Sequence, residues 1–304
     1  MMEISGSVRS YEPWGGAVET GTGRGWGVEA SLRYCTATAR GHYENFPVFA
    51  PMLDGSQRAA LAAIYSFART ADDFADEPVY AGSRLELLDH WERQLDLACA
   101  GSASHPVFTA LSWAIGRYGL DTALLHDLLG AFRQDCIKHR YESWDELMAY
   151  CRRSANPVGR LVLGVLGLKG ERHAVHSDCI CTALQLANFW QDISVDVPRG
   201  RIYLPVDDMA QFGLTEGELV RGENQHSLAK VVRHEAKRTR ELFERGRPLL
   251  FEAGWPGAPY LAAVWLGGTT ILREVVASSD RIRGHRPHVG LVPVLKRLMA
   301  GGAA

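Results

Sequence analysis

Acidic residues recur at one-turn spacing in two stretches of the sequence. Asp72 and Asp76 lie four residues apart in YSFARTADDFADEP. Asn188, Asp192 and Asp196 repeat that spacing in LQLANFWQDISVDVPRGRIY. Residues at i and i+4 share one face of a helix, so each stretch predicts a row of oxygen ligands. Mg²⁺ is a hard cation that binds carboxylates together with substrate phosphates. Two facing rows would therefore hold Mg²⁺ around a diphosphate.

Each acidic row ends two residues before a proline, Pro78 in the first stretch and Pro198 in the second. The residue before a proline is disfavoured in the helical conformation, so each row is predicted to close a helix. Carboxylates at a helix C-terminus meet the negative end of the helix dipole and repel each other, at about 0.3–1 kcal/mol for each contact. The alternative is a pair of solvated acidic helix ends, but the recurrence of so unfavourable an arrangement favours a cation site.

The apolar residues follow a helical period almost throughout from Glu29 onward. Prolines and glycines interrupt this period, and neither a repeat nor a long linker divides the chain. We therefore expect one all-α domain over 29–304, with its site inside the bundle, and a disordered or loosely ordered tail over 1–28. The predicted helices are 30–44, 56–77, 83–100, 105–118, 121–138, 143–152, 155–168, 172–196, 215–221, 226–253, 257–279 and 290–300.

Composition narrows the class of protein. The 304 residues are 46% hydrophobic, which is enough for a sizeable core. The 33 basic and 35 acidic residues leave a net charge of −2, which gives no electrostatic basis for a nucleic-acid partner. Six cysteines without a CxxC pair suit a reducing cytoplasm. No signal peptide is evident, and the apolar stretch 259–272 is too short to span a bilayer.

Further polar residues stand near the acidic rows. Tyr65 and Arg69 share a helix face with the first row. Arg69 either forms an intrahelical salt bridge, worth only about 0.3–0.5 kcal/mol, or lies beside a metal-held diphosphate. Arg199 and Arg201 follow the second row, and further arginines cluster at 281–286. Their guanidinium forks match phosphate oxygens, although each could equally be ordinary surface charge.

The sequence resembles the squalene/phytoene synthase family over residues 38–298. The resemblance rests on HYENF, YSFARTADDFAD, YESWDELMAYCRRSANPVGR and LQLANFWQDISVDVPRGRIYLP. It implies an isoprenoid-synthase helical bundle with a central active-site cavity. It also implies a prenyl diphosphate substrate and a cluster of Mg²⁺, two or three ions as the family binds them, and we expect no NADPH.

The resemblance assigns roles residue by residue. The metal ligands it implies are Asp72, Asp76, Asn188, Asp192 and Asp196. The catalytic residues it implies are Asp72, Asp76, Asp192, Asp196, Tyr65 and Tyr141. The substrate-binding residues are His42, Asn45, Phe46, Arg69, Gln185, Phe189, Arg199 and Arg201. The chain departs from common family patterns at SANPVGR, at Gln191 and at Asn45.

Several motifs look most like the branch of the family that makes hydroxysqualene for hopanoids, namely ENFPV, ARTADD, RRSANPVGR and QLANFWQD. This branch implies conversion of presqualene diphosphate to hydroxysqualene with release of diphosphate. One alternative is head-to-head condensation of two prenyl diphosphates, which needs the same metal motifs. Another is a non-catalytic assembly factor on the same fold, which complete carboxylate rows disfavour. A C30 product suits a cytoplasmic protein with peripheral contact at the inner face of the membrane, and substrate channelling to other hopanoid-pathway enzymes.

Overall fold

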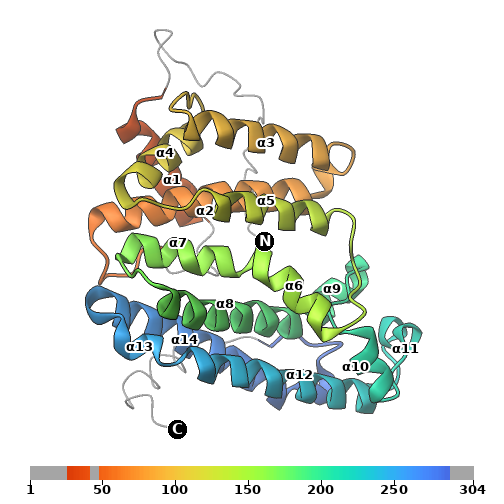
Figure 1. The fold of residues 1–304 in the computed structure, drawn as a ribbon. Coiled ribbons are helices and arrows are strands. Elements are labelled where there is room, and N and C mark those ends of the chain that lie inside the picture. The colour runs from red at the N-terminus through yellow and green to blue at the C-terminus, as the bar shows by residue number, and fades with distance from the viewer. Residues whose placement is uncertain (1–25, 42–47, 288–304) are drawn as a thin grey trace, which may run out of the picture.

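The computed structural model describes residues 26–41 and 48–287, and all their regular structure is helical (Figure 1). This confirms the predicted all-α class. The α-helices are α1 (Val28–Gly41), α2 (Gly55–Asp76), α3 (Arg84–Cys99), α4 (Pro106–Tyr118), α5 (Ala123–Asp135), α6 (Trp144–Ser154), α7 (Asn156–Leu166), α8 (Glu171–Gln191), α9 (Ile193–Asp196), α10 (Val206–Gln211), α11 (Glu216–Arg221), α12 (Gln225–Gly246), α13 (Leu249–Glu252) and α14 (Gly254–Ala277). Three short 3₁₀ helices are η1 (Pro78–Tyr80), η2 (Val197–Arg199) and η3 (Ser279–Arg281).

Helix α8 lies inside a stack of helices, with other helices on both sides of it (Figure 1). It packs against α7 on one side and against α12 and α14 on the other. Helix α2 packs against α1, α3, α4 and α5, and α7 contacts both α2 and α8. Helix α2 carries the first acidic row and α8 leads into the second, so the two rows lie in neighbouring parts of one bundle.

Packing on its buried face fixes the rotation of α2. The helix begins with a capping box in which the Asp54 side chain accepts a hydrogen bond from the Gln57 backbone N–H. Its buried face includes Phe67 and Phe74, and both rings contact the Trp91 ring of α3. The Trp91 indole N–H also donates to the Phe67 carbonyl oxygen at 3.2 Å. With these aromatic rings in the core, the acidic row at the end of α2 is left on the other side of the helix.

The structure corrects several predicted boundaries. The single helix predicted over 172–196 is wrong, because α8 ends at Gln191 and Asp192 (φ −96°, ψ 9°) separates it from α9. The helix predicted over 226–253 is also wrong, because α12 ends at Gly246 and Pro248 precedes the short α13. Helix α10 was not predicted, since six residues are too few to show a helical period. The helix predicted over 290–300 lies outside the described residues.

Candidate active site

The first acidic row closes α2 as predicted. Asp76 is its last residue, and Glu77 is extended before Pro78. Arg69 lies 3.4 Å from Asp72 and 2.5 Å from Asp73, so the intrahelical salt bridge considered from the sequence is present. Asp76 pairs instead with a residue far along the chain. The Arg201 guanidinium donates to its two carboxylate oxygens at 2.6 and 2.9 Å.

The second acidic row spans a break in the helix, but its hydrogen bonds continue across the break. The backbone N–H of Asp192 donates to the Asn188 carbonyl oxygen at 2.9 Å, and that of Asp196 donates to the Asp192 carbonyl oxygen at 2.8 Å. The one-turn spacing of the row is therefore kept. The Asp192 carboxylate accepts hydrogen bonds from Arg286 at 2.5 and 3.2 Å, across 94 residues of sequence.

The two rows face each other closely enough to interact electrostatically. Desolvation and the negative charge of Asp76 raise the pKa of Asp72 to about 7. The Asp72 side chain is still 41% exposed, so the surrounding protein removes part of its water contact but not all of it. Desolvation and the charge of Asp192 raise the pKa of Asp196 to about 7, and Asp76 on the opposite row adds to this. The rows form one concentrated patch of carboxylates.

Backbone hydrogen bonds position the segment that follows the second row. The N–H groups of Ile202, Val206 and Asp207 donate to the carbonyl oxygens of His139, Tyr141 and Glu142 at 3.0, 3.0 and 3.1 Å. Gly200 takes the left-handed conformation (φ 81°) that turns the chain into this segment. Segments 139–142 and 200–207 therefore run side by side, and this path brings Arg201 to Asp76.

An aromatic wall lies beside the acidic rows. The rings of Phe189 and Tyr203 stack with their centroids 3.7 Å apart and an interplanar angle of 5°. The Tyr141 ring stacks on Tyr203 with the centroids 5.9 Å apart, and the Tyr150 ring stacks on Phe189 with the centroids 6.1 Å apart. A pocket is lined by Phe189, Ile193, Asp196, Val197, Arg201, Ile202, Tyr203 and Leu204. One pocket thus joins an aromatic face to a carboxylate and a guanidinium.

Sequence reasoning missed one carboxyl group of this site, Asp135. It closes α5, and its Oδ2 accepts a hydrogen bond from the Tyr150 hydroxyl at 2.9 Å. Desolvation raises the pKa of Asp135 to about 7, and the charges of Asp76 and Asp72 add to the increase. Asp135 stands at a helix C-terminus, as the acidic rows do. It has no second carboxylate four residues away, however, so the spacing that identified the rows could not identify Asp135.

The predicted residues divide into three groups. The structure brings together Asp72, Asp76, Asp192, Asp196, Arg69, Arg201, Tyr141 and Phe189. Tyr65 on α2 and Gln185 and Asn188 on α8 are half-buried on the helices that carry the rows, and Arg199 is exposed but its charge lowers the pKa of Asp196. His42, Asn45 and Phe46 lie outside the described residues.

The donor set fits Mg²⁺. Carboxylate oxygens are the ligands that this cation prefers. Four carboxylates are present here: Asp72 and Asp76 on α2, Asp192 between α8 and α9, and Asp196 at the end of α9. Desolvation, followed by the charge of a neighbouring carboxylate, raises the pKa values of Asp72 and Asp196, and a bound cation would offset both effects. Arg201 and Arg286 already neutralise one carboxylate in each row. Asp72, Asp76, Asp192 and Asp196 are the residues of this patch that would hold the ion.

The family model for squalene/phytoene synthase matches residues 39–292. The chain belongs to this family, which places it in isoprenoid biosynthesis and supports head-to-head condensation chemistry on prenyl diphosphates. It is 32% identical to phytoene synthase of Arthrospira platensis over 88% of this chain and 90% of that protein. It is 39% identical to hydroxysqualene synthase of Zymomonas mobilis over 68% of this chain and 70% of that protein.

Solved structures give the same assignment. Squalene synthase HpnC from Alicyclobacillus acidocaldarius superposes with a TM-score of 0.78 at 37% identity, covering 83% of this chain and 95% of that one. A ligand-bound dehydrosqualene synthase superposes with a TM-score of 0.79 at 25% identity, covering 90% of this chain and 97% of that one. Among the described helices, none combines the length and apolar character needed to cross a membrane.

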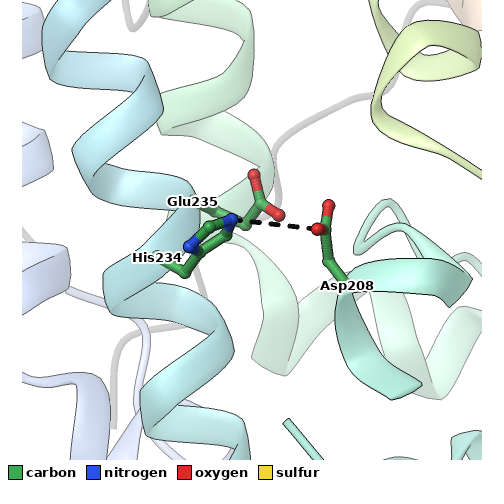
Figure 2. A group of neighbouring side chains, drawn as sticks. All are labelled: Asp208, His234 and Glu235. Carbon is green, nitrogen blue, oxygen red and sulfur yellow. Dashed lines mark ion pairs between the residues drawn. The ribbon is translucent and has the colours of Figure 1, made fainter. Parts of the chain in front are cut away.

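A second carboxylate cluster lies away from the aspartate rows. Figure 2 shows His234 and Glu235 of α12 beside Asp208 of α10, with the His234 ring 3.8 Å from the Asp208 carboxylate. These side chains could hold a metal ion, but the Arg238 guanidinium already lies among them. Its Nη1 is 2.8 Å from Asp208, 3.4 Å from Glu235 and 3.5 Å from His234. The cluster contains its own cation and anchors α10 to α12.

A proton on Glu235 completes the charge balance of this cluster. The residue is fully buried, and its Oε2 lacks a hydrogen-bond donor among the described residues. Burial raises the pKa of Glu235 to about 9, and Asp208 adds to the increase as its hydrogen-bond partner. A protonated carboxyl group can donate to Asp208, which a carboxylate cannot do.

The variant Glu235→Gln should gain stability over the wild type as pH rises. The folded state binds this proton more tightly than the unfolded chain, whose ordinary pKa is 4.5, so the wild type loses stability between about pH 4.5 and pH 9. Glutamine does not titrate. The difference in unfolding free energy should widen in favour of the variant by up to about 1.4 kcal/mol per pH unit. Urea unfolding at pH 6, 7 and 8 measures it. Glu244→Gln, half-exposed on the same helix, is the control, and an equal difference at all three pH values would contradict a buried proton.

The metal-free protein should tolerate the loss of charge at Asp72. The pKa of Asp72 is about 7 in the folded protein and 3.8 in its ordinary state, so ionisation of Asp72 lowers the stability of the fold as pH rises from about 4 to 7. In EDTA at pH 8, Asp72→Asn should melt no lower than the wild type, and any gain should shrink toward pH 4. Arg69 keeps its contact with Asp73 in the variant. Mg²⁺ with diphosphate should then raise the melting temperature of the wild type more than that of the variant. A metal-free variant that melts clearly below wild type would identify Asp72 as a structural partner instead.

Proposed function

We propose that the protein converts presqualene diphosphate and water to hydroxysqualene and diphosphate with the help of Mg²⁺. The observation that carries this proposal is the pair of facing acidic rows beside an aromatic wall. The 39% identity to a hydroxysqualene synthase, and the motifs ENFPV, RRSANPVGR and QLANFWQD, support this branch of the family.

The first step is cleavage of the carbon–oxygen bond to diphosphate, which leaves with the electron pair. Asp72, Asp76, Asn188, Asp192 and Asp196 would hold Mg²⁺, which when bound supplies Lewis-acid stabilisation of the departing anion. Arg69 and Arg201 lie among these ligands and would bind diphosphate oxygens with their guanidinium groups.

The second step is capture of the carbocation by water, which forms a carbon–oxygen bond and releases a proton. The stacked faces of Phe189 and Tyr203 would stabilise the cation, because an aromatic face attracts positive charge. Tyr141 and Tyr150 extend this wall, and the Tyr150 hydroxyl donates a hydrogen bond to the Asp135 carboxyl group. Gln185 on α8 and Tyr65 on α2 are candidates to orient the water, and Asn188 could do so only where metal does not occupy it. Water capture consumes no hydride, so NADPH is not required.

A second candidate function is head-to-head condensation of two prenyl diphosphates. It is favoured by the phytoene synthase of Arthrospira platensis, which matches 88% of this chain. The same carboxylates and arginines would serve it, because condensation also begins with the departure of diphosphate.

The test is incubation with presqualene diphosphate and Mg²⁺ in ¹⁸O-labelled water, with and without NADPH. We expect ¹⁸O-labelled hydroxysqualene in both reactions. Squalene formed only with NADPH would indicate reductive capture of the cation. Parallel incubations with farnesyl and geranylgeranyl diphosphate test the second candidate, and their consumption without turnover of presqualene diphosphate would establish a condensing synthase. Inertness toward all three would favour the non-catalytic assembly factor.

The chemistry of the product suggests where the protein acts. A C30 alcohol is insoluble in water, so we propose a cytoplasmic enzyme that makes peripheral contact with the membrane and passes its product to other hopanoid-pathway enzymes. All six cysteines lie within the described residues and are free thiols, in keeping with a reducing compartment. Co-sedimentation with anionic liposomes, with and without added salt, measures such contact.

A further inference from the structure

Two arginines from outside the row helices each engage both oxygens of an acidic-row carboxylate. Arg201 approaches Asp76 from the segment after Gly200, and Arg286 approaches Asp192 from the segment after η3. The side chain of Arg201 is only 15% exposed, so its ion pair is well shielded from water. Bidentate ion pairs of this kind are the strongest that arginine forms with carboxylates.

These ion pairs and bound Mg²⁺ exclude each other in part. A guanidinium facing both oxygens of a carboxylate places a positive charge where the metal would approach. Mg²⁺ alone must therefore displace the guanidinium or bind against its repulsion. Diphosphate changes this balance, because its oxygens offer each guanidinium a partner with more negative charge than one carboxylate.

We propose that Arg201 and Arg286 act as exchangeable counterions, which pair with Asp76 and Asp192 in the metal-free protein and transfer to diphosphate when Mg²⁺ binds. The inference rests on the proposed Mg²⁺–diphosphate site and adds a regulatory role for two residues of this chain. Its consequence is that Mg²⁺ alone binds weakly, whereas Mg²⁺ and diphosphate bind cooperatively. The carboxylates are then kept from taking up metal without substrate.

The exchange at Arg286 also affects the chain around it. The carbonyl oxygen of Pro287, the next residue, accepts a hydrogen bond from the Gln191 side chain at 2.7 Å. Gln191 ends α8 and directly precedes Asp192. Two neighbouring contacts therefore attach this part of the chain to the end of α8, and the Arg286 contact is the one that metal binding would break.

Removal of one counterion gives opposite effects on two binding reactions. Isothermal titration calorimetry without prenyl substrate would measure Mg²⁺ alone, and then inorganic diphosphate at saturating Mg²⁺. Arg286→Gln should bind Mg²⁺ alone about two- to fivefold more tightly than the wild type, in line with the loss of one partly exposed ion pair. It should bind diphosphate about tenfold more weakly. Arg286→Lys keeps the positive charge but loses the forked guanidinium. Both of its affinities should fall between those of the wild type and those of Arg286→Gln.

Arg283→Gln is the matched control. Arg283 lies three residues before Arg286 but donates to the carbonyl oxygens of Leu219 and Val220 at 2.9 and 3.0 Å. It should change neither affinity. If Arg286→Gln does not fold, as judged by circular dichroism, Arg201→Gln is measured in the same way.

Each remaining outcome decides against the proposal. Unchanged or weaker binding of Mg²⁺ alone would show that the arginine does not compete with metal. Tighter metal binding with unchanged diphosphate affinity would refute the transfer. A wild-type protein that binds Mg²⁺ and diphosphate normally, with variants that show neither change, would overturn the counterion role and leave the proposed function intact. A wild-type protein that binds no Mg²⁺–diphosphate would refute both.

Discussion

Replacement of Asp192 by asparagine is expected to lower kcat with presqualene diphosphate by at least about a hundredfold, and Asp72→Asn should do the same from the opposite row. Each change removes one negative ligand from the group that would hold Mg²⁺ against the leaving diphosphate. The loss of one such contact weakens transition-state stabilisation by about 3 kcal/mol or more. Because the contact strengthens as negative charge develops on the leaving group, kcat should fall more than KM rises.

A carboxylate far from the rows provides the control. Asp280 pairs with Arg233 at 2.6 Å on an exposed part of the molecule, so it is also a carboxylate held by an arginine. Asp280→Asn should leave kcat within about twofold of the wild type, because exposed pairs contribute little. Circular dichroism should show equal helix content in all three variants. Full turnover by either row variant, or by the wild type in EDTA, would contradict the metal site.

The second large effect is expected on stability, at the close contact between α12 and α8. A Cβ atom on Gly246 would lie 2.8 Å from the His176 carbonyl oxygen, 3.1 Å from the Ile180 backbone nitrogen and 2.5 Å from Ile180 Cγ1. Two of these atoms belong to the backbone of α8 and cannot move aside as a side-chain tip can. Gly246→Ala should therefore lower the free energy of unfolding by about 3 kcal/mol, measured by urea denaturation.

Gly267 provides the matched control in a neighbouring helix. It lies inside α14, and a Cβ atom there would meet nothing within 4 Å. Gly267→Ala should stabilise the protein by about 0.5–1 kcal/mol, because alanine loses less backbone entropy in a helix. Equal effects of the two alanines would show that α12 can shift away from α8, and the close approach at Gly246 would then not limit the packing.

Local periodicity explains what could be predicted from the sequence. The spacing of Asp72 and Asp76 and the proline that follows them are determined within one turn of helix, and α2 ends where the sequence indicates. The spacing of Asn188, Asp192 and Asp196 likewise survives the break at Asp192, because the one-turn hydrogen bonds continue through it. Helix-end carboxylates could therefore be identified without knowledge of the tertiary structure.

Tertiary packing accounts for what could not be predicted. The partners of Asp76 and Asp192 lie 125 and 94 residues away along the chain, and no local pattern selects them from the other arginines. Asp135 belongs to the site because Tyr150 donates a hydrogen bond to it and the charges of the first row act on it, which the end of α5 alone does not reveal. The single helix predicted over 172–196 was wrong because its period runs unbroken through Asp192, where the backbone conformation changes.

The side-by-side path of segments 139–142 and 200–207 bears on how enzymes of this fold could acquire different products. The three hydrogen bonds that hold the path join backbone atoms, so they do not depend on which side chains the segments carry, provided that residues 202, 206 and 207 keep their N–H groups. Side chains such as Tyr203 could therefore change in size or polarity while the segment keeps its course and Arg201 its place. The shape of the pocket could then change without disturbing the charged groups that handle the diphosphate.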